Sequence, residues 1–179
     1  MSTLVVKRLT RGALLAALVL GLAGPAMAVG GDTWITTKAK IALMTEDNVR
    51  ARDVNVDTEN GNVTIHGKVR TEAEKAKAES VVKQIDGVKT VRNLLQVVPE
   101  TRRESVKAAD GEIKSKVEAA IKQDAALKDQ DVKVASVNKG VVLLSGKTAN
   151  LDQKLRAIEA AAKVDGVERV ATEIKTEQP

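Results

Sequence analysis

The sequence of 179 residues contains no cysteine, no phenylalanine and no tyrosine, and Trp34 is its single aromatic residue. Without cysteine the chain can form neither a structural disulfide nor a lipid-modified N-terminal cysteine. The near absence of aromatic rings also removes the stacking surfaces on which single-stranded nucleic acids bind. These absences exclude a disulfide scaffold and argue against a nucleic-acid partner.

An excess of one sign of charge is also missing once the N-terminal segment is set aside. The whole chain has 29 basic and 24 acidic residues, a formal net charge of +5. Lys7, Arg8 and Arg11 lie in the first 28 residues, which hold no acidic residue, so the remainder has 26 basic against 24 acidic residues and a formal charge of +2. With no basic cluster, we expect no nucleic-acid binding.

Motifs of catalysis and metal binding are lacking as well. The sequence has no nucleophile elbow, no phosphate-binding glycine loop and no metal motif. Its one histidine, His66, alternates with Val63 and Ile65, so we expect its ring to point away from the core, toward solvent or a turn. One histidine without cysteine does not supply the ligands of a zinc site. We therefore expect no catalytic residues, no metal and no cofactor.

The N-terminus has the three-part pattern of a secretory signal peptide. Basic residues precede the apolar run from Ala13 to Leu22, and Ala26-Met27-Ala28 follows it. The run falls short of the ~20 apolar residues that a membrane-spanning helix needs, which disfavours the alternative of an anchor. We expect a signal peptide at residues 1–28, cleavage after Ala28 and a periplasmic mature protein that begins at Val29.

The rest of the chain is an internal repeat of residues 32–98 and 110–176. Asp53-Val54-x-Val56 matches Asp131-Val132-x-Val134, and Asp86-Gly87-Val88 matches Asp165-Gly166-Val167. Residues 99–109 between the copies are polar and charged after Pro99, which predicts either a linker or an extension of the following helix.

Each copy predicts a helix, two strands, a helix and a strand. Apolar residues at helical spacing open the first copy at Ile35, Ala39, Ala42 and Leu43, and the second copy repeats this stripe. Asp32 and the matching Asp110 are expected at helix N-caps. A second helix with an apolar stripe comes later in each copy. The predicted fold class is α+β, with two tandem α-β-β-α-β modules, each a three-stranded sheet covered on one face by two helices.

Short alternating strands in each copy are joined by turn residues. Val54 and Val56 face Val63 and Ile65 across Asn60-Gly61, a dipeptide suited to a type I′ hairpin. The second copy has one residue more between its strands, so there we expect a three-residue loop, Asn138-Lys139-Gly140.

The repeated motifs resemble the BON domain of bacterial envelope proteins. The resemblance is carried by Asp53-Val54-x-Val56, Asn60-Gly61-x-Val63-x-Ile65-x-Gly67 and Ile85-Asp86-Gly87-Val88-x-x-Val91-x-Asn93-x-Leu95. A leader followed by two such domains is similar to the osmotically inducible periplasmic group. The resemblance implies an envelope or osmotic-stress protein that binds phospholipid membranes or envelope proteins without catalysis. A related two-domain lipoprotein recognises anionic phospholipid through its second domain. Because this chain lacks the lipid-modified cysteine, we expect its lipid contact to be peripheral and reversible.

The two copies differ in their apolar residues. Val141 and Leu143 stand where the first copy has polar Asn62 and Thr64. This excess predicts docking of the two modules, a thicker core, or a binding surface in the second module. The hypothetical surface for anionic phospholipid, or in the alternative for apolar segments of envelope proteins bound by a chaperone or adaptor, comprises Val141, Leu143, Leu151, Leu155, Ile158, Lys147, Lys154 and Arg156.

Trp34 has no counterpart in the second copy, where Glu112 takes its place. We expect its ring to fold over the edge of the first module, and the alternative is an anchor for a membrane or a partner.

Overall fold

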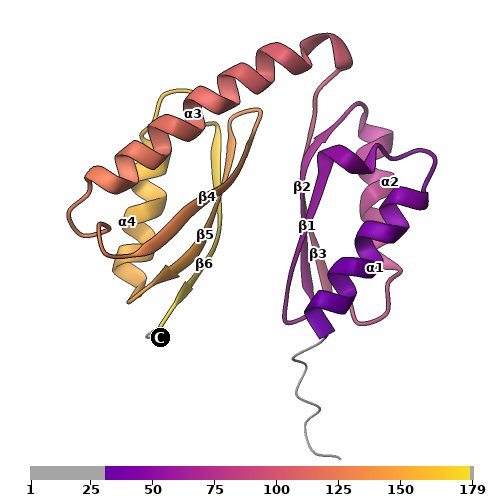
Figure 1. Cartoon of the computed structure of the whole chain (residues 1–179), viewed down its shortest axis with the longest axis horizontal. Coiled ribbons are helices and arrows are strands. Elements are labelled where there is room, and N and C mark those ends of the chain that lie inside the picture. Colours follow the sequence, from indigo (N-terminus) through magenta and orange to yellow (C-terminus); the bar gives the residue numbers. More distant parts are fainter. Residues whose placement is uncertain (1–30, 178–179) are drawn as a thin grey trace, which may run out of the picture.

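The computed structural model describes residues 31–177 as two modules of the same architecture (Figure 1). The first comprises α1 (Gly31–Thr45), a 3₁₀ turn (Ala51–Asp53), β1 (Val54–Glu59), β2 (Asn62–Val69), α2 (Glu72–Lys83) and β3 (Thr90–Val97). The second comprises α3 (Arg103–Gln123), β4 (Asp131–Asn138), β5 (Val141–Thr148), α4 (Leu151–Ala162) and β6 (Arg169–Thr176). The expected signal peptide lies outside the described residues.

In each sheet the second strand in chain order, β2 or β5, is the central one. β2 pairs antiparallel with β1 and parallel with β3, and β5 pairs in the same way with β4 and β6. A short turn makes the first pair of each sheet antiparallel, whereas the crossover through α2 or α4 returns the third strand parallel. The predicted α+β class and the two tandem modules are confirmed.

Each module has a core of its own between its sheet and its two helices. Val54, Val56, Val63 and Ile65 are buried in the first core, as the alternation predicted. In the second core Val134, Val142 and Leu144 are buried, and Val132 packs against them.

The two hairpin turns have the same length, which corrects one expectation. Asn60 and Gly61 have φ angles of 53° and 80°, as a type I′ turn requires. In the second module Lys139 and Gly140 form an equivalent turn with φ angles of 50° and 72°, so the expected three-residue loop is wrong. The additional residue lies in β4, where the pairing register shifts between Val134 and Ser136. A β-bulge absorbs one residue inside a strand, so the turn keeps its favoured geometry.

Asp32 and Asp110 hold these turns instead of capping helices, so the N-cap prediction is wrong. Asp32 lies in the first turn of α1, and Asp110 lies well inside α3. The carboxylate of Asp110 accepts the backbone N–H groups of Lys139 and Gly140 at 3.0 and 3.1 Å. The carboxylate of Asp32 binds the matching turn of the first module in the same way, at 2.6 and 2.8 Å.

The segment between the modules is mostly helical. Of the two alternatives for residues 99–109, the structure shows the extension of the following helix: a 3₁₀ turn (Glu100–Arg102) leads directly into α3, which begins at Arg103. The 3₁₀ turn and the first part of α3 therefore connect β3 to the core of the second module.

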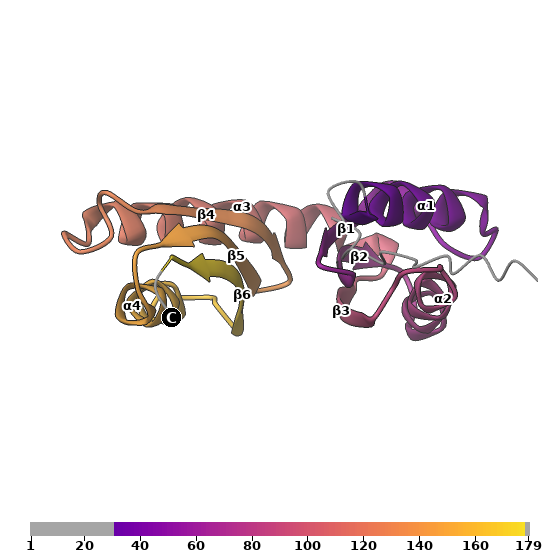
Figure 2. The same ribbon diagram turned by 90° about the horizontal axis from the view of Figure 1, so that it is seen from below.

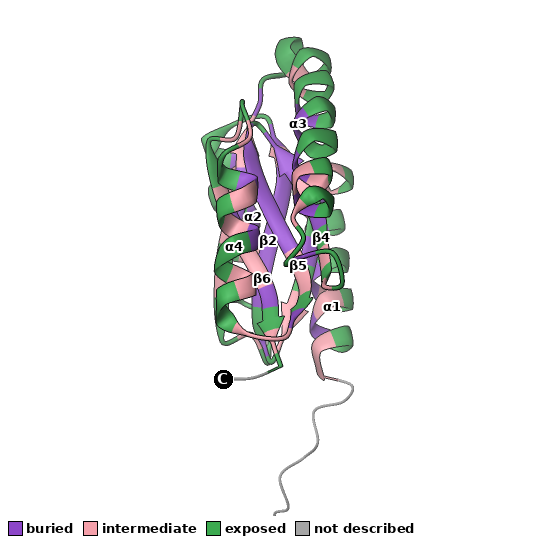
Figure 3. Ribbon diagram, turned by 90° about the vertical axis from the view of Figure 1, so that its left-hand side faces the viewer, coloured by how far each residue is buried: buried purple, intermediate pink, exposed green. Residues whose placement is uncertain are grey.

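The two sheets face one another, and each pair of helices covers the outer side of its own sheet (Figures 1 and 2). The outward sides of the helices are exposed and the strands between them are largely buried (Figure 3). The face of each sheet that carries no helices is thus turned toward the other module.

Candidate binding surfaces

A small apolar contact joins the facing sheets. Leu94 in β3, Leu143 in β5 and Ala171 in β6 form a buried cluster, and Leu143 is only 1% exposed. Val141 is buried on the same face of β5 as Leu143. The structure thus places Val141 and Leu143 on the side where the modules dock, one of the alternatives that the sequence left open.

His66 lies in the same contact region, and its burial differs from the position expected from the sequence. Its ring points away from the core of its own module, but the side chain is buried and the residue only 5% exposed, so a solvent-facing position is wrong. Nε2 donates to Oδ2 of Asp57 at 2.9 Å, because a carboxylate can only accept. This hydrogen bond lowers the pKa of Asp57 below its usual value, although burial acts to raise it. The sequence of one module does not reveal that this side of its sheet faces a second module.

Polar contacts cross between the modules along the length of the facing sheets. Lys68 Nζ in β2 lies 2.7 Å from Oδ2 of Asp110 in α3. Farther along, Arg92 Nη1 donates to the carbonyl of Thr172 at 3.2 Å. Lys175 and Glu59 form an ion pair of 2.7 Å.

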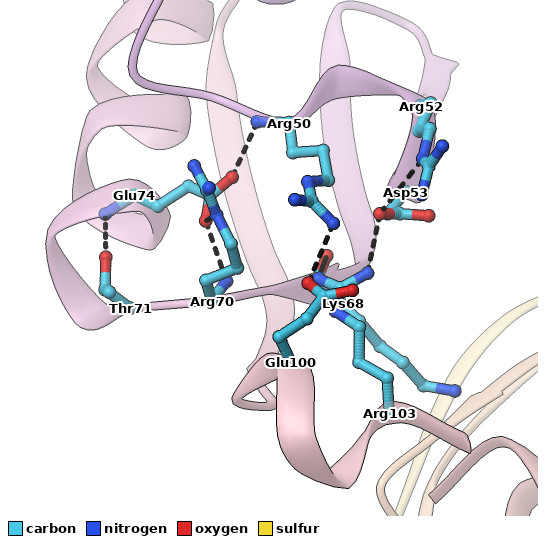
Figure 4. A network of polar contacts seen from close by, with 9 residues as sticks. All are labelled: Arg50, Arg52, Asp53, Lys68, Arg70, Thr71, Glu74, Glu100 and Arg103. Carbon is cyan, nitrogen blue, oxygen red and sulfur yellow. Dashed lines mark hydrogen bonds and ion pairs between the residues drawn. The ribbon is translucent and has the colours of Figure 1, made fainter.

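The start of α3 is anchored to the first module by a charged network (Figure 4). Arg103 Nη1 lies 2.6 Å from Oδ2 of Asp53, and its other Nη donates to the carbonyl of Lys68 at 3.4 Å. Arg50 Nη1 lies 2.8 Å from Oε2 of Glu100. Because the residues come from the segment before β1, from β2, and from the start of α3 with the 3₁₀ turn before it, the network forms a joint that positions one module on the other.

Glu74, also drawn in Figure 4, ties the start of α2 to the loop after α1. Its carboxylate accepts the backbone N–H groups of Arg50 at 2.6 Å and of Arg70 at 2.7 Å. Burial acts to raise the pKa of Glu74, but these N–H groups and the Arg70 guanidinium outweigh it, and the pKa lies below its usual value. In the sequence, the capping-box pattern Thr71-x-x-Glu74 could have predicted this helix start. In the structure, the Thr71 side chain accepts the backbone N–H of Glu74 at 3.1 Å.

The candidate residues of α4 fall into two groups. Leu151 and Leu155 are more than half exposed, whereas Ile158 packs partly against the second core. Leu155 and Arg156 line a hollow of about 330 Å³, where Arg156 Nε lies 2.6 Å from Oδ2 of Asp124.

Lys147 and Lys154 belong to a different site. Both line a groove of about 840 Å³ that is bounded by the two modules. The eight residues of the hypothetical surface therefore lie in four places: the contact between the sheets, the groove, the outer side of α4 and, for Ile158, the margin of the second core.

An exposed apolar stripe on α1 was missed by the sequence reasoning. Trp34, Ile41 and Met44 are 59%, 57% and 74% exposed, while the opposite side of the helix is buried through Ile35, Ala39 and Leu43. Lys38 Nζ lies 5.1 Å from the centroid of the Trp34 ring, a cation–π contact. The ring does not fold over the module edge, so that expectation is wrong. The spacing of residues 34, 41 and 44 could have predicted this stripe, because it places the three side chains on one side of a helix.

The second module has no such stripe, because Glu112, Ala119 and Lys122 occupy the matching positions. Within residues 31–177, no helix has both the length and the apolar character to cross a membrane. Over the same residues, no group of three or more histidine, aspartate or glutamate side chains is arranged to hold a metal ion.

The BON domain profile matches residues 31–99 and 109–178, one match for each module. The chain belongs to the BON domain family. Among relatives of this family, osmotically-inducible protein Y of Escherichia coli is 36% identical over 147 residues, which cover 81% of this chain and 72% of the relative. Outer membrane lipoprotein DolP of Haemophilus influenzae is 36% identical over 63 residues, 35% of this chain and 32% of DolP.

Solved structures give a weaker likeness. The C-terminal domain of CdsD, a structural protein of the type III secretion system of Chlamydia trachomatis, aligns with 81% of this chain and 66% of its own length. Its sequence identity is 15% and its TM-score 0.32, a level too low for a comparison of the two folds.

Proposed function

We propose that the protein is a non-catalytic, exported envelope protein that attaches reversibly to phospholipid membranes, and that α1 makes the contact. The stripe of Trp34, Ile41 and Met44 carries this proposal, because the three exposed side chains share one side of a helix whose other side is held in the core. A surface helix with tryptophan among its apolar residues is suited to the boundary between headgroups and acyl chains.

The charges of α1 favour an anionic surface. Lys38 and Lys40 are its basic residues, and its one acidic residue, Asp32, is bound to the β1–β2 turn. Each lysine close to an anionic membrane contributes about 1 kcal/mol of attraction. Half-exposed apolar side chains that enter the membrane add roughly 1 kcal/mol each, less than full burial gives. The sum supports weak, reversible attachment.

The relatives support an envelope role. One is named for osmotic induction and another as an outer membrane lipoprotein. With the expected signal peptide at residues 1–28, these names favour a periplasmic protein of the osmotic or envelope-stress response.

Flotation of the exported protein with lipid vesicles tests the proposal. We expect it to float with vesicles rich in phosphatidylglycerol and much less with vesicles of phosphatidylcholine alone. Replacing Trp34, Ile41 and Met44 together by serine abolishes flotation if α1 makes the contact. The matched control replaces Leu151 and Leu155, which are similarly exposed on α4, by serine.

The same pair of variants separates α1 from the surface suggested by the sequence. If the α4 variant loses flotation and the α1 variant keeps it, the second module carries the lipid contact and α1 does not. Flotation of both variants at the level of the unmodified protein excludes both helices as the membrane contact.

A second candidate function, binding of apolar segments of envelope proteins as a chaperone or adaptor, is favoured by α4. Leu155 borders the hollow of about 330 Å³, and Leu151 is exposed one helical turn before it. Suppression of the aggregation of a denatured outer-membrane protein measures this activity. We expect the serine variant of Leu151 and Leu155 to lose suppression, and the α1 variant to keep it.

A further inference from the structure

The contacts between the modules differ in exposure from one end to the other. At the joint, the Lys68 and Asp110 side chains are 17% and 6% exposed, so their ion pair is shielded from water, whereas the neighbouring pair of Arg50 and Glu100 is 30% and 60% exposed. At the other end, which we call the mouth, Glu59 and Lys175 form an ion pair that is 44% and 57% exposed. Dissolved ions screen exposed pairs strongly and shielded pairs much less.

Little apolar surface holds the modules together between these ends. The buried cluster that spans them consists of Leu94, Leu143 and Ala171, whereas each module has a separate core of at least eleven buried residues. Separation at the mouth therefore leaves both cores intact.

The mouth is already partly open. The groove of about 840 Å³ lies there, and its walls include Glu59, Thr64 and Arg92 from the first module and Lys147 and Lys175 from the second. Figure 1 shows the two sheets closer together near the β4–β5 turn and farther apart toward the end of β6. The ion pair of Glu59 and Lys175 thus bridges the groove at its open side.

We propose that the molecule is a hinge that responds to ionic strength: it opens at the mouth when dissolved ions screen the ion pair of Glu59 and Lys175. The shielded contacts of Arg103 with Asp53 and of Lys68 with Asp110 form the pivot. Opening widens the groove and uncovers Leu143. This inference does not depend on membrane attachment through α1.

Distances between two spin labels test the hinge directly. The native chain has no cysteine, so Ser80→Cys in α2 and Asp152→Cys in α4 place one label on an exposed site of each module. Pulsed electron paramagnetic resonance is recorded while KCl rises from about 0.1 M to about 1 M, which shortens the Debye length from about 10 Å to about 3 Å. We expect the ratio of a longer-distance population to the closed one to rise by up to about fivefold, the range for an exposed ion pair.

Variants of the ion pair show whether it is the sensor. In Glu59→Gln with Lys175→Gln, the longer distance is expected already at low salt, and its dependence on KCl is lost. The charge swap Glu59→Lys with Lys175→Glu restores both closure and salt dependence. Lys133→Gln is the matched control, because Lys133 pairs with Asp131 inside the second module at 2.8 Å and is similarly exposed.

Sucrose at the osmolality of the KCl solutions separates ionic strength from osmotic pressure, and we expect it to leave the distances unchanged. The proposal is overturned by distances that do not respond to KCl, by an equal response to sucrose, or by a charge swap that fails to restore closure.

Discussion

Lys68 Nζ lies 2.7 Å from Oδ2 of Asp110, and through this contact the first module touches the carboxylate that holds the β4–β5 turn of the second. The same carboxylate accepts the N–H groups of Lys139 and Gly140. Asp32 holds the β1–β2 turn by the same two bonds. Within residues 31–177, the structure shows no ion pair between Asp32 and a lysine or arginine. Asp110 therefore differs from Asp32 in its ion pair with Lys68 and in the deeper burial of its turn contacts.

Asp110→Ala should destabilise the second module more than Asp32→Ala destabilises the first. Both variants leave two turn N–H groups without a partner, a loss of about 1–3 kcal/mol. Asp110→Ala also leaves the Lys68 ammonium shielded and uncompensated, and breaking a buried pair costs about 3–5 kcal/mol. Urea unfolding of each variant measures the difference. Equal losses would mean that Lys68 contributes nothing to stability.

Val56→Asp should unfold the first module. Val56 is 2% exposed in the first core, and an unpaired charge there costs several kcal/mol. Circular dichroism during heating measures the loss. The neighbouring Asn55→Asp adds the same charge on the exposed side of β1 and should leave the melting curve nearly unchanged. A normal melting curve for Val56→Asp would contradict the assignment of faces.

Glu74 should make the first module sensitive to acid. Its pKa is lowered in the folded protein, so its carboxylate stabilises the fold above the unfolded pKa of about 4.3, and this stabilisation is lost as pH falls through the folded pKa. Glu74→Gln should thus lower the free energy of unfolding by roughly 1–3 kcal/mol at neutral pH. We expect this deficit to shrink below about pH 4, as measured by urea unfolding across pH. A deficit that is independent of pH would show that charge plays no part.

Leu155 and Ile158 should respond differently to substitution. Leu155 is exposed, so Leu155→Ser should leave the stability of the second module within about 0.5 kcal/mol of the native value. Ile158 packs against the second core, so Ile158→Glu should destabilise the module measurably. Thermal unfolding of the two variants tests this split. Equal stability of both would place Ile158 outside the core.

The sequence by itself determined the repeat, the order of elements and the core face of each strand. Val54, Val56, Val63 and Ile65 alternate with polar residues, and a strand turns alternate side chains to opposite faces, so neighbours in sequence suffice to assign the core. Asn60-Gly61 predicted its turn for the same local reason: both residues adopt the positive φ that the turn demands.

Only the tertiary structure decided what covers the faces turned away from the cores. Leu143 is buried because the other module lies over it, and His66 lies beside Leu94 of the same contact. No periodicity within one module encodes that placement. Likewise, the eight residues proposed as one surface lie at separate places in the folded chain. Trp34 stayed exposed because the core accepts only one side of α1, and Ile35, Ala39 and Leu43 already occupy that side. Burial depends on which surfaces meet, and surfaces far apart in the chain meet only in the folded molecule.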